Sequence, residues 1–139
     1  MLRYHGGKWR LAPWIIEHFP PHRIYTEPFA GGASVLLQKP RSYSEVLNDL
    51  HGEIVNVFRV MRDRGEDLRE RLRFTPFSRD EYYGSFESTE DDPIEQARKT
   101  IIRSFMGFGS NSINRAVRSG FRSGTTPPRG WRNYPDHVQ

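Results

Sequence analysis

The strongest constraint in this sequence is a glycine pair that lies between two short apolar segments. Residues 23–29 predict a strand, Gly31-Gly32 predicts a tight turn, and residues 33–38 predict a helix. A second strand is expected at about 43–47, and Asp49 follows it closely. Such a βαβ unit is typical of nucleotide-like ligands, because glycine lets the ligand approach the backbone and the acid accepts hydrogen bonds from ribose hydroxyls. The spacing is not G-x-G-x-x-G, so an ordinary strand-to-helix turn also fits.

The remaining pattern is mainly helical. Helices are predicted at about residues 9–18, 51–64, 66–74, from Ser78 onward, and 94–106. Gly65 is expected to end the helix at 51–64. The apolar face of that helix is predicted to be Ile54, Val55, Phe58 and Met61. The residues predicted to face solvent are Glu53, Asn56, Arg59 and Arg62.

Composition excludes several classes of protein. A length of 139 residues predicts one domain at most, and the absence of cysteine excludes disulfides and thiolate metal sites. His18 and His22 are separated by Pro20-Pro21, so they do not form a helical metal-binding pair, and no metal site is expected. No apolar run is long enough for a membrane span, which favours a cytoplasmic protein.

The excess positive charge lies at one end of the sequence. Residues 1–100 contain 15 Lys and Arg against 16 Asp and Glu, whereas residues 101–139 contain six Arg against one acid, Asp136. Arginine suits bidentate contact with phosphate and with guanine. Phe121 and Trp131 lie between the arginines and Tyr134 follows the last of them, a pattern typical of a loop that contacts nucleic acid. An ordinary solvated tail would have a similar composition.

Four segments carry a family resemblance. They are R-Y-H-G-G-K (3–8), T-E-P-F-A-G-G-A-S (26–34), L-N-D-L (47–50) and R-S-F-M-G-F-G-S-N (103–111). In this order they resemble the D12 class of S-adenosylmethionine-dependent DNA adenine-N6 methyltransferases, over nearly the whole chain. The resemblance implies an α/β fold, in which a partial Rossmann-like sheet is followed by a mainly helical target-recognition region. It also implies methyl transfer to a flipped adenine of double-stranded DNA.

The resemblance also implies roles for individual residues. Those that match the family's cofactor-binding motifs are Tyr4, Lys8, Glu27, Phe29, Gly31, Gly32 and Asp49. Lys8 would meet the methionine carboxylate of S-adenosylmethionine, the glycine turn would hold the methionine part, and Asp49 would bind the ribose hydroxyls. The residues expected to contact DNA are Arg103, Asn111, Arg115, Arg118 and Arg122.

One departure from the family changes the expected function. The family's D-P-P-Y motif is absent, because neither Pro20-Pro21 nor Pro127-Pro128 follows an acid or precedes an aromatic ring that would complete it. No catalytic residue is therefore assigned. We expect residues 1–75 to be the N-terminal part of the cofactor-binding domain and residues 76–139 a truncated target-recognition region. The chain alone would then be inactive, and it would be the product of a truncated gene, an incomplete sequence, or one half of a split enzyme whose separate C-terminal half carries the catalytic motif. The alternatives are a non-catalytic DNA-binding module and a different nucleotide-binding α/β enzyme.

Overall fold

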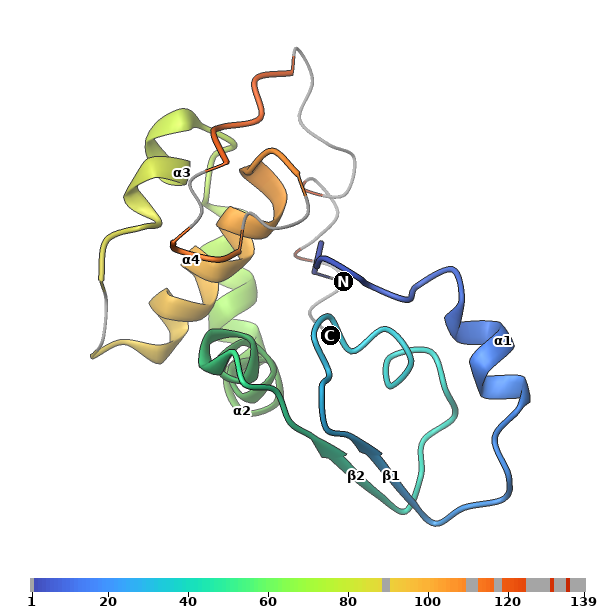
Figure 1. Ribbon diagram of the computed structural model, residues 1–139. Helices are drawn as coiled ribbons and strands as arrows, with labels where there is room; N and C mark the ends of the chain where they lie inside the picture. Colours follow the sequence, from blue (N-terminus) through green and yellow to red (C-terminus); the bar gives the residue numbers. More distant parts are fainter. Residues whose placement is uncertain are drawn as a thin grey trace.

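The computed structural model describes residues 2–88, 91–109, 113–116, 119–124, 131 and 135. Its elements are α1 (Ala12–Glu17), β1 (Ile24–Glu27), β2 (Ser44–Leu47), α2 (Gly52–Arg73), α3 (Arg79–Gly84) and α4 (Pro93–Met106). Helices α2, α3 and α4 form one part of the molecule, and the two strands with α1 form the other (Figure 1). Within the described ranges, no helix combines the length and the apolar character needed to cross a membrane.

The two strands form a parallel sheet, as the sequence predicts. Ile24 pairs with Ser44 and Glu27 pairs with Leu47. Parallel pairing places the carboxyl ends of both strands at one edge, where Glu27 ends β1 and Asp49 follows β2 by two residues. The fold is therefore mixed α/β with a small parallel sheet, and the strands are shorter than the segments predicted from the sequence.

The helix predicted at residues 33–38 is wrong, because residues 31–38 form a series of turns. Ala33 has a φ of 49°, in the left-handed region that an α-helix does not use. The amide of Leu36 donates to Glu27 Oε1 at 2.7 Å, which removes it from a helical ladder. A carboxylate at the end of β1 therefore replaces the carbonyl partner that a helix would have supplied.

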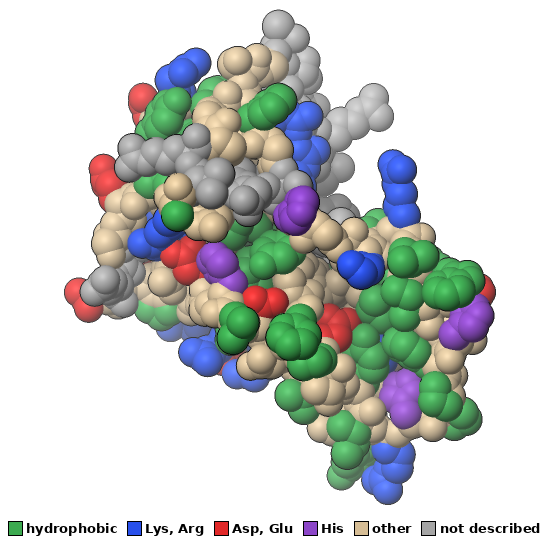
Figure 2. Space-filling view, in the orientation of Figure 1, with side chains coloured by type: hydrophobic (Ala, Val, Ile, Leu, Met, Phe, Trp, Pro, Cys, Tyr) green, Lys and Arg blue, Asp and Glu red, His purple; other side chains and the backbone are tan. Residues whose placement is uncertain are grey.

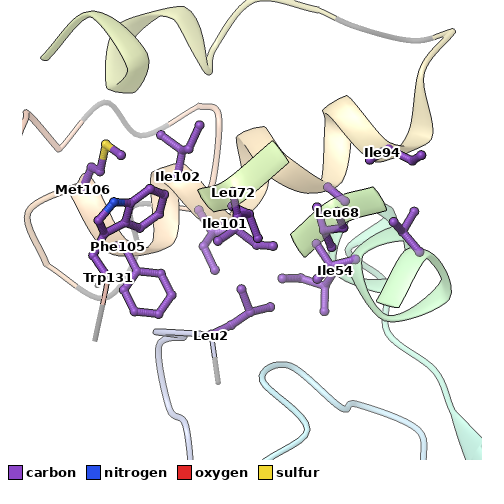
Figure 3. Close-up of a cluster of buried hydrophobic side chains, with 14 of the residues drawn as sticks. Leu2, Ile54, Leu68, Leu72, Ile94, Ile101, Ile102, Phe105, Met106 and Trp131 are labelled. Carbon is purple, nitrogen blue, oxygen red and sulfur yellow. The ribbon is translucent and has the colours of Figure 1, made fainter. Parts of the chain in front are cut away.

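The hydrophobic core lies between α2 and α4. Figure 3 shows Ile54, Leu68 and Leu72 of α2 close to Ile101 of α4, with Leu2 of the N-terminal segment beside them. The predicted helix at 94–106 is confirmed as α4, with Asp92 as its N-cap. The proposed boundary at residues 75 and 76 stays a prediction, and the helices before and after it share this core.

Helix α2 corrects two details of the sequence prediction. The two predicted helices are one element with a break at Arg64 (φ −140°, ψ 37°), one residue before the predicted cap at Gly65. Of the predicted apolar face only Ile54 is buried, and the buried face is completed by Val57 and Val60. Asn56, which the periodicity predicts to face solvent, is also buried, and its amide donates to the Pro93 carbonyl at 2.8 Å. The polar side chain of Asn56 is therefore used for packing against the start of α4.

A buried ion cluster joins α2 to α4 and to the chain after α4. The carboxylate of Glu53 binds the guanidinium of Arg103, and its Oε1 lies 2.5 Å from Arg115 Nε. Arg103 is completely buried, and it also donates to the carbonyls of Ser85 and Ile113. Burial lowers the pKa of Arg103, whereas the charge of Glu53 opposes that shift. Glu53, which the periodicity predicts to be outward, therefore compensates a buried cation.

Replacing Glu53 by glutamine is expected to destabilise the chain strongly. Glu53→Gln removes the carboxylate and leaves the buried Arg103 charge uncompensated, which costs about 3–5 kcal/mol in typical cases. Urea denaturation measures the loss. The matched control is Glu66→Gln, because Glu66 is exposed and its ion pair lies at the surface, so its effect should stay below about 0.5 kcal/mol. Equal midpoints for the two variants would contradict the structural role of Glu53.

Candidate functional site

A cavity of about 370 Å³ lies at the carboxyl edge of β1, between the N-terminal segment and the glycine turn. Its size falls within the range of small-molecule sites, which is about 300–1,000 Å³. Its lining comes from three stretches of chain, which are residues 4–8, 25–35 in part, and Ile15 of α1. The cavity lies at the place where parallel α/β sheets bind their ligands.

Asp49 holds the glycine turn against the end of β2. Its Oδ2 accepts from the amide of Gly31 at 2.7 Å, and its Oδ1 accepts from the amide of His51 at 2.8 Å. The amide of Ala30 also donates to the carbonyl of Asn48 at 2.9 Å. These bonds join the turn after β1 to the segment after β2, so the side chain of Asp49 fixes one side of the cavity.

Glu27 organises the opposite end of the same turn. Its Oε1 accepts from the hydroxyl of Tyr25 at 2.8 Å and from the amide of Leu36 at 2.7 Å. Burial, and then the hydrogen bond to Glu27, raise the pKa of Tyr25 far above its ordinary value. The Tyr25 hydroxyl therefore stays protonated as a donor, and Glu27 stays in the cavity wall.

The ring of Tyr4 packs directly on Gly31. A Cβ at Gly31 would lie 2.8 Å from Cδ1 and Cε1 of Tyr4, and Gly31 has a φ of 49°, so both space and backbone conformation require glycine. Burial, and then the charge of Asp49, raise the pKa of the Tyr4 hydroxyl. The ring is thus part of the wall beside the turn.

Lys8 supplies the positive charge of the cavity. It follows a turn in which Gly6 has a φ of 74° and the amide of Gly7 donates to the backbone carbonyl of Tyr4 at 3.1 Å. The ammonium donates to the carbonyl of Gly6 at 3.0 Å, and no described carboxylate forms an ion pair with it. An exposed ammonium without an acidic partner can bind an anionic group of a ligand.

The structure brings the predicted cofactor residues together. Six of them line the cavity, namely Tyr4, Lys8, Glu27, Phe29, Gly31 and Gly32. Asp49 is not among the lining residues, but it accepts a hydrogen bond from the amide of Gly31, which is. Tyr25 also lines the cavity and was not predicted, although the alternation of side chains along a strand places it on the same side as Glu27. Among the described residues, no cluster of His, Asp and Glu is suited to a metal ion.

The residues predicted to contact nucleic acid are placed differently. Arg103 has no exposed surface, and its guanidinium is committed to the buried ion cluster. Arg115 is partly exposed and pairs with Glu53. Arg122 is also partly exposed, and its amide donates to the carbonyl of Met106, the last residue of α4. Asn111 and Arg118 lie outside the described residues. The sequence does not distinguish a buried arginine from an exposed one here, because residues 99–106 of α4 are all buried, whichever side of the helix they occupy.

Comparison with known proteins identifies one family. The model of the D12 class N6 adenine-specific DNA methyltransferases matches residues 4–136. Type II methyltransferase M1.LlaDCHI of Lactococcus lactis subsp. cremoris is 33% identical over 95 residues, covering 65% of this chain and 32% of the relative. DNA adenine methylase of Escherichia coli (strain K12) is 25% identical over 118 residues, covering 82% of this chain and 42% of the relative. The chain thus spans less than half the length of these relatives.

Replacing Gly31 by alanine is expected to destabilise the cavity wall. Gly31→Ala forces a Cβ against the Tyr4 ring at a backbone conformation that alanine rarely adopts, at a cost of about 1–3 kcal/mol. Urea denaturation measures the change. The control is Gly52→Ala, because a Cβ there meets nothing within 4 Å. If both variants unfolded at the wild-type midpoint, the close packing of Tyr4 on Gly31 would be refuted.

Proposed function

This chain belongs to the D12 class of N6 adenine-specific DNA methyltransferases, and on that basis we propose that its cavity binds S-adenosylmethionine for methyl transfer to adenine in DNA. The observation that carries the proposal is the convergence of Lys8, Tyr4 and the glycine turn on one cavity at the carboxyl edge of β1. We infer that β1 and β2 belong to a Rossmann-like sheet.

The described side chains fit the parts of this cofactor. The ammonium of Lys8, which forms no ion pair with a described carboxylate, suits the methionine carboxylate, and Glu27 in the cavity wall suits the methionine ammonium. Asp49 accepts one backbone hydrogen bond at each oxygen, and each oxygen retains a lone pair that ribose hydroxyls can use. The exposed ring of Phe29 offers an apolar surface at the cavity.

The role of the chain in catalysis would be positioning. When bound, S-adenosylmethionine supplies a methyl group on a positively charged sulfur. Residues of the cavity wall would hold that donor in one orientation, and alignment of the reactants contributes much of the rate in such transfers. The sequence contains no D-P-P-Y motif, so we propose that polypeptide outside these 139 residues binds the adenine amino group.

The DNA partner would meet the arginine-rich segment after α4. Arg115 and Arg122 are partly exposed and remain candidates for phosphate contacts, together with Asn111 and Arg118. Arg103 is assigned a structural role instead, because each of the three nitrogens of its guanidinium already donates a hydrogen bond within the protein.

Removing the charges at the cavity is expected to weaken S-adenosylmethionine binding. Lys8→Ala and Asp49→Ala should each raise the dissociation constant by about tenfold or more, since a hydrogen bond to a charged group contributes on the order of 1.5–3 kcal/mol. Isothermal titration calorimetry measures the change.

The control for this titration is Asp63→Ala. Asp63 is an exposed acid on α2 that pairs with Arg62, and it lies outside the cavity lining. The Asp63→Ala variant should bind S-adenosylmethionine with the affinity of the wild type. Saturable DNA binding without any cofactor binding would favour the non-catalytic DNA-binding module over the proposed function.

The isolated chain is expected to transfer no methyl group. Because no D-P-P-Y motif is present to hold the adenine amino group, incubation with DNA and S-adenosylmethionine labelled in the methyl group should leave the DNA unlabelled. Addition of a polypeptide that carries the catalytic motif of a family member is the positive control. Incorporation by the chain alone would show that its own residues complete the site.

A further inference from the structure

Ser104 lies in the last turns of α4 and has no exposed surface. A hydroxyl inside a helix often donates to the carbonyl four residues earlier, as Thr100 does to Gln96 at 2.9 Å. The Ser104 hydroxyl donates instead to the backbone carbonyl of Arg3 at 3.1 Å, and its oxygen accepts from the backbone amide of Arg3 at 2.7 Å. One side chain of α4 therefore satisfies both backbone groups of a residue 101 positions earlier in the sequence.

Two further contacts hold the N-terminal segment on α4. Leu2 is 4% exposed and belongs to the core between α2 and α4 (Figure 3). The guanidinium of Arg3 lies 5.9 Å from the centroid of the Phe105 ring, a distance at which a cation is attracted to the ring. The segment is therefore fixed on α4 at residues 2 and 3.

The residues on both sides of Arg3 contact the glycine turn of the cavity. The ring of Tyr4 packs on Gly31, and a Cβ at Gly32 would lie 3.4 Å from Tyr4 Cβ and 3.5 Å from the carbonyl oxygen of Leu2. Both glycines are buried by these contacts. A shift of the backbone at Arg3 would therefore move the surface against which the turn packs.

The same segment determines where Lys8 lies. Residues 2–8 contain no helix or strand that could fix their position independently. The amide of Gly7 donates to the carbonyl of Tyr4 at 3.1 Å, and the carbonyl of Lys8 accepts from the amide of Ala12 at 2.7 Å. Lys8 is thus held between a turn that begins at Tyr4 and the start of α1, so its ammonium depends on the position of that turn.

We propose that Ser104 is a positioning residue for the methyl-donor site, because its hydroxyl fixes residues 3–8 on α4 and thereby holds Tyr4 and Lys8 in the cavity wall. The inference rests on the proposed function for the identity of the ligand. Ser104 is not among the lining residues, so it acts through the N-terminal segment. Without the hydroxyl, the amide and the carbonyl of Arg3 lose a buried partner, and the backbone moves to recover hydrogen bonds.

The first test compares two buried serines in the full 139-residue chain. Ser104→Ala should raise the dissociation constant of S-adenosylmethionine about fivefold in isothermal titration calorimetry, the scale that corresponds to one net hydrogen bond. The matched control is Ser85→Ala, because Ser85 is 1% exposed and its hydroxyl donates locally to the carbonyl of Tyr82 at 2.6 Å. This control should lose stability in urea but retain the wild-type affinity. Equal affinities for the two variants would leave Ser104 with a purely structural role and overturn the proposal.

A double-mutant cycle separates positioning from a general loss of stability. If Ser104 acts by placing Lys8, Ser104→Ala should weaken binding less in a chain that already carries Lys8→Ala than in the wild type. A loss of stability alone would weaken binding by the same factor in both backgrounds. That additive result would contradict the proposed action of Ser104 through Lys8.

Hydrogen exchange tests the cavity wall in the free chain. The amides of Gly7 and Gly31 donate within the wall, whereas the amide of Asn48 donates to the carbonyl of Glu27 across the sheet. In Ser104→Ala, exchange at Gly7 and Gly31 should accelerate relative to exchange at Asn48, and in Ser85→Ala these ratios should stay at the wild-type values. Unchanged ratios in Ser104→Ala would refute the positioning role. If the wild type bound no S-adenosylmethionine, the proposed function would fail, and the exchange ratios would still decide whether Ser104 fixes the wall.

Discussion

The site depends on two carboxylates at the carboxyl ends of neighbouring parallel strands. Glu27 binds the amide of Leu36 and Asp49 binds the amide of Gly31, so both ends of the glycine turn are tied to the sheet. These bonds hold the turn in left-handed conformations at Gly31 and Ala33 that it would otherwise leave for a helix. The acids therefore shape the cavity as well as supplying acceptors for a ligand.

Much of this arrangement could be predicted from the sequence, and the parts that could not have physical reasons. The local sequence pattern predicts the two strands, the glycine turn, the acid after β2 and the helix α4. The turns at residues 31–38 depend on the hydrogen bond from the Leu36 amide to the side chain of Glu27, nine residues earlier in the sequence. Helix propensity does not take such a contact into account. Likewise, Glu53 and Arg103 can be buried only because each compensates the charge of the other. Neither residue taken singly in the sequence indicates that it is buried.

The N-terminal segment connects the two parts of the molecule residue by residue. Leu2 enters the core between α2 and α4 (Figure 3). The backbone of Arg3 forms hydrogen bonds with the Ser104 hydroxyl of α4, and the ring of Tyr4 packs on Gly31. A displacement of α4 would therefore be transmitted to the glycine turn through three successive residues. The cavity at the glycine turn and helix α4 are therefore connected through the N-terminal segment, which the glycine pattern in the sequence does not reveal.

The open face of the sheet has a thermodynamic consequence. Ile24 and Val46 are exposed on paired strands, and hydrophobic side chains gather on the face of the molecule that contains α1 and the strands (Figure 2). Parallel sheets normally bury both faces. A polypeptide that covers these side chains would bind the folded state and not the unfolded state, and would therefore raise the free energy of unfolding by mass action. The melting temperature should then report how much of the sheet is covered, and it becomes a direct gauge of assembly with the covering polypeptide.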